Sequence, residues 1–450
     1  MNSALLRKTK ITLSDYPYRR DIDNRLLISH LSVFEVDVLK EILHLSLKIS
    51  VEQLADYLDI SAENLIPILD KLSATKLFKR DYLTLVVDKE VRKYYEFQME
   101  KFDEDFQPDM EFLQNLLNRV PLHVLPVWYI IPRTSDNIFD SIVEKFFQTP
   151  KIYLQYLEEL QFEDPILQSI MQDVYQAPGF KLTASQIMAK YALSPECFEE
   201  CLLQLEYHFA CCLSYEKVND RWEEVVTPFH ELKEYLQLEA SMKPKSIKEA
   251  ARIEKTCEVE QGFIKEMAAV LTACQRKGKQ IEEFKPLYLS DLTQVIAKLV
   301  QIGLAKKDNL SLSITEKGLL WLKKPIAEQM SHLAMDSLNR PTLYIESPLW
   351  NLRNLRLIEK SLRRFAVSEW IYVEDFIKGF TAPLGDRDPI GLKNRGKKWR
   401  YVFPVYQEDE LNFIRFVITE RLFELGVISL GSHQGKPCFC LTSVGNQFVY

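Results

Sequence analysis

Two stretches of the sequence, 133 residues apart, carry the same pattern of turn and apolar residues. Residues 183–194 match residues 50–61, with Gln186 aligned on Gln53, and the apolar positions that follow each stretch also coincide. In both, a short helix leads through a turn to a serine that can cap the next helix. Because all of these matching positions are separated by the same 133 residues, they indicate an internal repeat. We therefore expect at least two copies of one small helical module.

The surroundings of the first stretch define that module. Residues 34–42 have the apolar spacing of a helix, and residues 77–87 alternate as the two strands of a β-hairpin. Helix, helix–turn–helix and hairpin, in this order, are the elements of a winged helix. The chain thus resembles the winged-helix superfamily, which implies modules that hold either nucleic acid or a protein partner.

Two later segments share a second signature. Residues 302–318 resemble residues 425–445: a glycine follows the expected third helix, and a Thr-x-x-Gly sequence follows the expected wing. Such a glycine ends a helix in the left-handed conformation, and the threonine would start a final helix. With the first two modules, this makes four winged helices.

The expected fold class is therefore mainly α with short β-hairpins, in the form of tandem winged-helix domains joined by helical connectors. The expected boundaries are an N-terminal arm at 1–30, winged helix 1 at 31–88, a helical connector at 89–149, winged helix 2 at 150–239, an exposed helical linker at 240–257, winged helix 3 at 258–325, and winged helix 4 with a basic insertion at 326–450.

The last module is also similar to the winged-helix regions that accompany some bacterial superfamily-two helicases. The residues that carry this similarity are Trp370, Asp375, Phe376, Phe416, Leu422, Leu425, Gly426, Val427, Leu441, Thr442 and Gly445. The phosphate loop and the acidic box of the helicase motor do not occur in the sequence, so the resemblance does not imply ATPase activity.

Glycine is scarce, and this scarcity excludes whole classes of function. Only 13 of the 450 residues are glycine, and none precedes Gly179. Nucleotide-binding loops need glycines where backbone N–H groups approach phosphates. The 7 histidines are scattered and match no hydrolase motif. We expect a protein that is not an enzyme and has no cofactor and no small-molecule substrate.

The 8 cysteines begin at Cys197 and form no regular disulfide framework, which favours the reducing cytoplasm. We expect neither export nor membrane insertion, because the first residues lack the apolar core of a signal peptide and no stretch is apolar enough to span a bilayer. Cys197, Cys201, His208 and Cys211 would share one face only if a single helix carried all four. Because a wing strand is expected from residue 209, we expect no zinc site.

Charge is unevenly distributed in a chain whose net charge is −7. Residues 340–400 hold thirteen Lys or Arg against seven Asp or Glu, and the cations are densest at 391–400, between the second and third helices of the last module. Such a segment suits phosphate contacts without base reading. A solvated loop and a loop docked on an acidic protein surface are the alternatives. The candidate nucleic-acid-binding residues are Arg353, Arg356, Arg363, Arg364, Lys393, Arg395, Lys397, Lys398, Trp399 and Arg400.

The side chains of the third helix of each module determine whether the module can recognise DNA bases, because this helix enters the major groove in winged helices that bind DNA. Three of the four helices begin with carboxylates, which repel phosphates. These residues are Glu63 in the first, Glu196, Glu199 and Glu200 in the second, and Glu408, Asp409 and Glu410 in the fourth. Only the third module offers a neutral or basic set, namely Ser290, Thr293, Gln294 and Lys298.

These observations predict a cytoplasmic, DNA-associated protein that does not bind membranes. The C-terminal basic segment would hold DNA without strong sequence preference, and the acidic modules would hold a protein such as a helicase, a polymerase or a chromosome-organising component. A protein scaffold without nucleic-acid contact is the alternative. The basic stretch at residues 7–20 is either a phosphate-binding arm or an ordinary mobile terminus.

Overall fold

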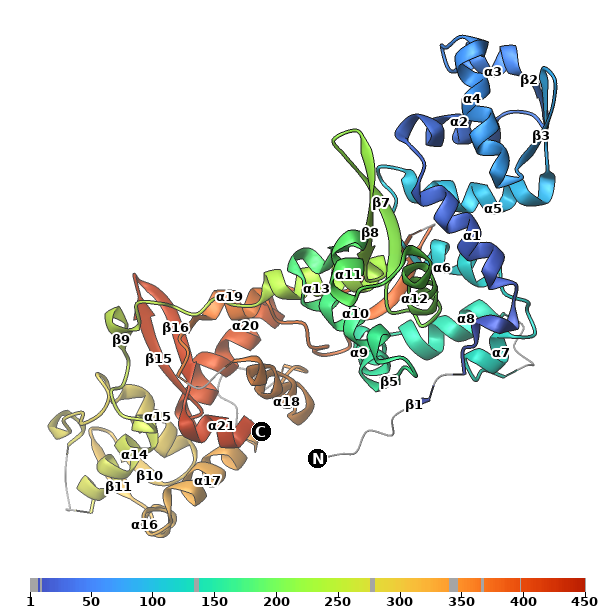
Figure 1. Cartoon of the computed structure of the whole chain (residues 1–450). Helices are drawn as coiled ribbons and strands as arrows, with labels where there is room; N and C mark the ends of the chain where they lie inside the picture. Colours follow the sequence, from blue (N-terminus) through green and yellow to red (C-terminus); the bar gives the residue numbers. More distant parts are fainter. Residues whose placement is uncertain are drawn as a thin grey trace. The chain divides into compact units, whose positions relative to one another are not determined.

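A computed structural model describes residues 7–8, 10–132, 137–275, 280–339, 347–365, 368–396 and 398–449 (Figure 1). These residues form mainly helices with short antiparallel hairpins, so the expected coarse fold class is confirmed. The chain divides into two compact units. Unit 1 comprises Met1–Gln237 and Gly391–Val402, and unit 2 comprises Leu238–Ile390 and Phe403–Tyr450.

In unit 1, helix α1 (Tyr18–Ser29) precedes six elements in the order helix, strand, helix, helix, strand, strand. We call this arrangement of six elements the motif. Motif 1 consists of α2 (Val33–His44), β2 (Lys48–Ser50), α3 (Val51–Tyr57), α4 (Ala62–Leu72), β3 (Phe78–Asp81) and β4 (Thr84–Val87). The sheet order is β2–β4–β3, because the short first strand pairs with the last one. Val38, Leu54 and Leu69, one from each helix, lie in its core.

Motif 2 repeats this arrangement with α10 (Pro165–Gln176), β6 (Leu182–Thr183), α11 (Ala184–Tyr191), α12 (Pro195–Tyr207), β7 (Cys212–Val218) and β8 (Arg221–Thr227), in the sheet order β6–β8–β7. The helix–turn–helix expected at residues 183–194 is present. Gln53 and Gln186 are both the third residue of the second helix, and each closes a capping box, with Ser50 and Thr183 respectively. Two backbone N–H groups are thereby satisfied at each helix start.

Unit 2 contains a partial version of the motif, motif 3, and a complete one, motif 4. In motif 3 a 3-10 turn (Ile281–Glu283) lies where the second helix would be. Motif 3 has α14 (Gly262–Ala273), α15 (Thr293–Gln301), β10 (Ala305–Asp308) and β11 (Ser311–Ile314), with a single bridge between Gln280 and Ser311 where the first strand would be. Motif 4 has α18 (Leu352–Ser361), β12 (Ile371–Tyr372), α19 (Val373–Lys378), α20 (Glu408–Phe416) with a π-helical continuation (Val417–Leu422), β15 (Ile428–His433) and β16 (Lys436–Leu441). Helices α16 (Glu316–Leu322), α17 (Ile326–Asn339) and α21 (Ser443–Val449) follow the two hairpins.

The glycine and threonine signature has a steric reason. Gly303 follows α15 with φ +74°, and the hydroxyl of Thr315 donates to its carbonyl oxygen at 2.8 Å. The same hydroxyl accepts from the Gly318 N–H at 3.0 Å, and a Cβ on Gly318 would lie 2.3 Å from the carbonyl oxygen of Leu304. Glycine is therefore required there. The corresponding residues of motif 4 are Gly426, Thr442 and Gly445.

The linker differs from the expected helix. Helix α13 (His230–Met242) ends early, and Glu254–Lys255 forms strand β9, which extends the sheet of motif 4 in the order β12–β16–β15–β9. The prediction of a helical linker is therefore wrong beyond Met242. The physical reason is that β15 offers unpaired backbone groups at its edge, and an adjacent extended segment satisfies them.

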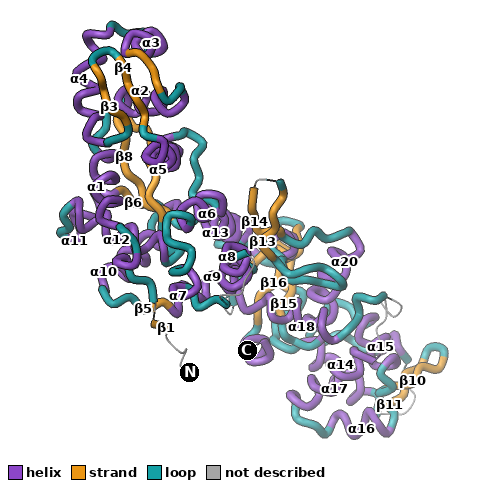
Figure 2. The backbone as a smooth tube through the Cα atoms, turned by 90° about the vertical axis from the view of Figure 1, so that its right-hand side faces the viewer, coloured by secondary structure: helices purple, strands orange, loops and turns teal. Residues whose placement is uncertain are grey.

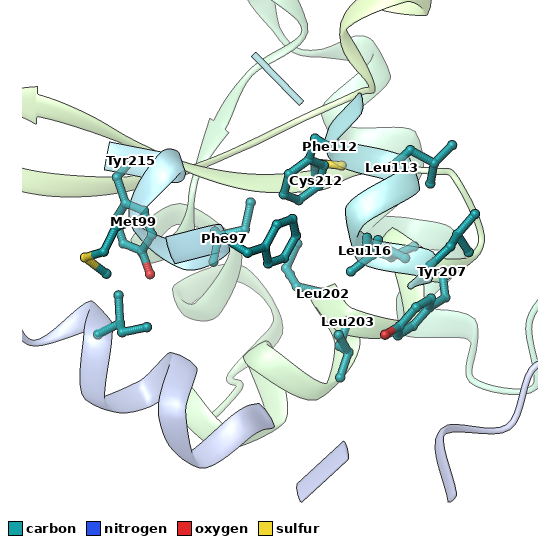
Figure 3. Packing of buried hydrophobic residues seen from close by; sticks show 14 of the residues in the cluster. Phe97, Met99, Phe112, Leu113, Leu116, Leu202, Leu203, Tyr207, Cys212 and Tyr215 are labelled. Atoms are coloured by element: carbon teal, nitrogen blue, oxygen red, sulfur yellow. The ribbon is translucent and has the colours of Figure 1, made fainter. Parts of the chain in front are cut away.

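The core of unit 1 extends from motif 1 through the connector into motif 2. The connector contains α5 (Lys89–Met99), α6 (Met110–Leu117), α7 (Leu125–Trp128) and α8 (Ile138–Ile142). Helix α9 (Pro150–Glu159) follows it, within the range expected for winged helix 2, and β5 (Leu160–Gln161) then pairs in parallel with β1 (Arg7–Lys8). Figure 3 shows Phe97 and Phe112 of the connector among Leu202 and Leu203 of α12. The rings of Phe97 and Phe112 stack with centroids 5.0 Å apart.

None of the helices in the part of the chain that the structure describes is long and apolar enough to cross a lipid bilayer.

Candidate nucleic-acid interface

The basic insertion is an ordered hairpin. Strands β13 (Gly391–Arg395) and β14 (Lys398–Val402) pair in antiparallel fashion, and Gly396 in the turn has φ +76°. The hairpin lies between α19 and α20 in sequence, as expected, but it packs within unit 1 and lies beside α6 (Figure 2). The chain therefore enters unit 1 a second time at Gly391 and leaves it after Val402.

One face of the hairpin packs on the core of unit 1. The Leu392 N–H donates to the carbonyl oxygen of Gln148 at 2.9 Å, and the Tyr401 hydroxyl donates to the carbonyl oxygen of Phe147 at 3.0 Å. Tyr401 is only 5% exposed. The Trp399 ring meets the Phe139 ring edge-on, with centroids 6.5 Å apart. The inner face is thus a set of anchors. It includes the half-buried Trp399, for which contact with nucleic acid stays a prediction.

The opposite face carries the cations. Lys393 is paired with Arg400, and Arg395 with Lys398, so the strand alternation places all four on the side away from Tyr401. All four are exposed, and residues 391–402 include no Asp or Glu. The fifth expected cation, Lys397, lies outside the described residues. We call Lys393, Arg395, Lys398 and Arg400 the basic face.

This arrangement is unfavourable for the hairpin itself. Like charges directly opposite each other on antiparallel strands are destabilising, on the scale of the roughly 0.2–1 kcal/mol that cross-strand pairs contribute. The basic face has two such pairs. The chemistry that the face offers is charge attraction and N–H donation to oxygen.

The four expected arginines of α18 and of the 3-10 helix that follows it (Leu362–Arg364) do not form a comparable set. Arg353 donates to the carbonyl oxygens of Gly385 at 2.6 Å and Pro383 at 3.3 Å, and Arg364 donates to Thr381 Oγ1 at 3.1 Å. These two side chains therefore brace the loop that precedes the hairpin. The side chain of Arg356 is 65% exposed and lies 3.9 Å from Glu359. Arg363 is exposed as well. For Arg356 and Arg363, phosphate contact stays a prediction.

One face of the third helix of motif 2, the face that carries Glu199 and Glu206, is covered by α1. Arg25 of α1 donates through Nε to Glu199 at 2.5 Å and through Nη1 to Glu206 at 2.7 Å, and Lys101 lies 3.4 Å from Glu206. All four side chains are at most 2% exposed. The expectation that Glu199 is presented to an external partner is wrong, because α1 supplies the cation that neutralises it.

The electrostatics of this cluster follow from the burial of paired charges. Burial by itself would raise the pKa of Glu206, but the charges of Arg25 and Lys101 outweigh it and lower that pKa to about 2. Glu206 also accepts the Leu213 N–H at 3.2 Å, at the start of the motif 2 hairpin. The cluster therefore joins α1, the connector and α12 by charge.

The third helices of motifs 3 and 4 are also partly occupied. Lys298 of α15, a member of the neutral or basic set of the third module, is paired with Glu424 at 2.7 Å and is 11% exposed. Its charge is therefore already neutralised by a carboxylate of the same unit. In α20, the carboxylate of Glu410 is held by Arg387 at 2.9 Å. The exposed positions of α15 carry no charge; they are Thr293, Gln294, Ala297 and Val300.

The side chains considered for zinc do not converge. Helix α12 ends at Tyr207, Cys197 at its start is exposed, and Cys211 beyond its end is fully buried. Among the residues that the structure describes, no group of three or more His, Cys, Asp and Glu could hold a metal ion. The absence of zinc stays a prediction for elemental analysis.

Two features of the site escaped the sequence reasoning. The inward orientation of Leu392 and Tyr401 could have been found in the sequence, because apolar and basic residues alternate with a period of two on either side of Gly396. No sequence pattern indicated the ion pair between Arg25 and Glu199, because 174 residues separate the two partners. A comparison with known proteins finds no family model that matches this sequence and no similar curated protein.

Proposed function

We propose that this chain is a non-enzymatic, nucleic-acid-associated protein built from four winged helices, and that the basic face contacts a phosphate backbone. The observation that carries the proposal is the sorting of the hairpin into an anchored apolar side and a side with four cations and no carboxylate. The winged-helix assignment is supported by the common strand order of motifs 1 and 2 and by the signature common to motifs 3 and 4.

The modules other than the hairpin would hold proteins. The start of α4 exposes Glu63 and Asn64, and this surface suits a basic protein partner better than DNA. A helicase, a polymerase or a chromosome-organising component fits a partner of this kind. The cytoplasm is the proposed compartment, because all of the cysteines are free and Cys211 and Cys212 are buried as thiols.

A protein scaffold without nucleic-acid contact is the second candidate. It is favoured by α12, whose acidic surface binds another helix, α1, through Arg25. In this case the basic face would dock an acidic protein surface.

The test is DNA binding by the full chain, measured by fluorescence anisotropy at several salt concentrations on two duplexes of unrelated sequence. We expect similar affinity for both duplexes, since backbone contacts carry no sequence information. Replacing Lys393, Arg395, Lys398 and Arg400 by Ala should weaken binding to both, and each lost contact should reduce the slope of log affinity against log salt by about 0.9.

A matched control removes four exposed lysines elsewhere, at Lys151, Lys243, Lys245 and Lys248. It changes the net charge equally and should leave the salt slope unchanged. An unchanged slope in the hairpin variant would disprove the role of the basic face. A wild type that binds no duplex even at low salt would leave the scaffold as the better proposal.

A further inference from the structure

In the described part of motif 3, a short 3-10 turn takes the place of the second helix that motifs 1, 2 and 4 contain. The second helix of motif 1 begins at Val51, whose N–H donates to the carbonyl oxygen of Leu83 at 2.8 Å. In motif 3 the Ile281 N–H donates to the carbonyl oxygen of Leu310, also at 2.8 Å. Leu83 and Leu310 each precede the last strand of their motif. Ile281 therefore corresponds to Val51, the first residue of a second helix.

A proline ends this helix after one turn. Ile281–Glu283 form the 3-10 turn, and Phe284 then lies buried, as Leu54 does at the fourth position of α3. Pro286 follows two residues later. It has no N–H to donate, and in a helix its ring would clash with the carbonyl group four residues before it. The remainder of a second helix is therefore prevented from forming.

The chain beyond Pro286 is held on α14. The side chain of Glu266 in α14 is fully buried, and its Oε2 accepts the N–H groups of three successive residues. These residues are Leu287 at 3.0 Å, Tyr288 at 2.5 Å and Leu289 at 3.1 Å. Hydrogen bonds to a carboxylate are about twice as strong as bonds between neutral groups. The loop is therefore fixed against α14, away from the end of α15.

A groove lies between this loop and α15. Its volume of about 570 Å³ is within the range of about 300–1,000 Å³ that is usual for pockets that bury a ligand. Phe284 and Pro286 line it on the loop side, and Ile296, Ala297 and Val300 line it on α15. Ala297 and Val300 are exposed. In motif 1, α3 packs against α4 at the corresponding place. Motif 3 thus has an apolar groove where a second helix would continue.

We propose that this groove binds a short amphipathic helix of a partner protein, which occupies the place of the turns that Pro286 prevents. This inference rests on the part of the proposed function that gives the modules protein partners, and it does not depend on the basic face.

The chemistry of the helix follows from the groove and from the second helices of the other motifs. The buried residues of α3 and α19 are spaced three and four positions apart; they are Val51, Leu54 and Ala55 in α3, and Val373, Phe376 and Ile377 in α19. The partner helix should have apolar residues at this spacing. Two carboxylates and one ammonium group, those of Glu282, Asp291 and Lys307, also line the groove. A helix with Lys or Arg on its polar side is therefore favoured.

The experiment selects short helical peptides from a phage-displayed library against the full chain and measures their affinity by fluorescence anisotropy. We expect the selected peptides to have apolar residues three or four positions apart and a net positive charge. Ala297→Arg should weaken their binding by about tenfold or more, because the long cation would enter the groove. Gln294→Arg is the matched control, exposed on the same helix, and should bind within twofold of the wild type. Thermal unfolding should be the same for both variants, since both positions are exposed.

Selected peptides that bind Ala297→Arg as tightly as the wild type, or a library that yields no binder, would overturn this inference. The salt slope of DNA binding, which tests the basic face, would be unaffected by either result. Hydrogen exchange in α15 that slows with a duplex but with no peptide would assign the groove to DNA. A dimer of the chain that Ala297→Arg dissociates would assign it to a second copy. Each of these two results would also overturn the inference.

Discussion

At the scale of single residues, the strongest constraint in unit 1 is the buried charge cluster around Arg25. Its guanidinium bonds Glu199 and Glu206, and Lys101 adds a second cation beside Glu206. Buried ion pairs stabilise little relative to an apolar core, but removing one partner leaves an uncompensated charge. The cluster therefore specifies where α1 packs.

Arg25→Ala should lower the free energy of unfolding of unit 1 by about 3–5 kcal/mol, because Glu199 and Glu206 would lose their buried partner. The measurement is urea denaturation. Arg19→Ala is a matched control on the same helix, since the Arg19 and Glu196 side chains are 69% and 62% exposed at 3.5 Å. Its effect should stay below about 1 kcal/mol. Equal effects of the two substitutions would contradict the assignment.

A second buried carboxyl group, that of Glu231, has a raised pKa, in contrast to the lowered pKa of Glu206. Glu231 is fully buried, and one of its oxygens accepts the Met110 N–H at 2.9 Å. Burial raises the pKa of Glu231 to about 8 from 4.5. A raised pKa means that the neutral form stabilises the fold below pH 4.5 and that this stability is lost as pH rises through about 8.

Glu231→Gln should therefore match the wild type near pH 4 and be more stable at pH 9, because the amide keeps an acceptor for Met110 and cannot ionise. The difference is expected on the order of a few kcal/mol. Thermal denaturation across this pH range measures it, with Glu234→Gln as the exposed control on the same helix. A stability difference that does not change with pH would refute the assignment.

At the scale of elements, the order of helices and hairpins could be predicted where local rules govern it. The capping boxes at Ser50 and Thr183 and the left-handed Gly303 and Gly426 are encoded within a few residues, and these signals located the motifs. Strand β9 could not be located in this way, because its pairing with β15 joins segments more than 170 residues apart.

The hairpin shows the same division between local and long-range information. Its position and positive charge were evident from residues 391–400, and its two-faced character was present in the alternation of residues. What covers the apolar face depends on Phe139 and Phe147, some 250 residues earlier in the chain. The sequence therefore predicted which residues form the candidate site. It did not predict which side of the hairpin would face the core and which would face outward.

At the scale of the whole molecule, the chain completes unit 1 with a segment that lies inside the sequence of unit 2. Replacing Gly391–Val402 by a short Gly-Ser turn should uncover the apolar residues beneath the inner face. Hydrogen exchange should increase in α8, α9 and the start of α13, while β15 and β16 in unit 2 keep their protection.

The quadruple alanine variant of the basic face is the control for this deletion, because it keeps Leu392, Trp399 and Tyr401. Its hydrogen exchange should match the wild type in both units. Exchange that increases equally in the two units after the deletion would contradict an anchoring role confined to unit 1.

The discontinuity of unit 1 also has a consequence during synthesis. A ribosome adds about 5–20 residues per second, so the segment between Gln237 and Val402 takes roughly 10–30 s to emerge after the rest of unit 1. Throughout that interval the nascent chain exposes the apolar side chains that Trp399 and Tyr401 later cover. Each newly made molecule therefore passes through a period in which a chaperone, or a neighbouring nascent chain, has access to that surface before the hairpin closes it.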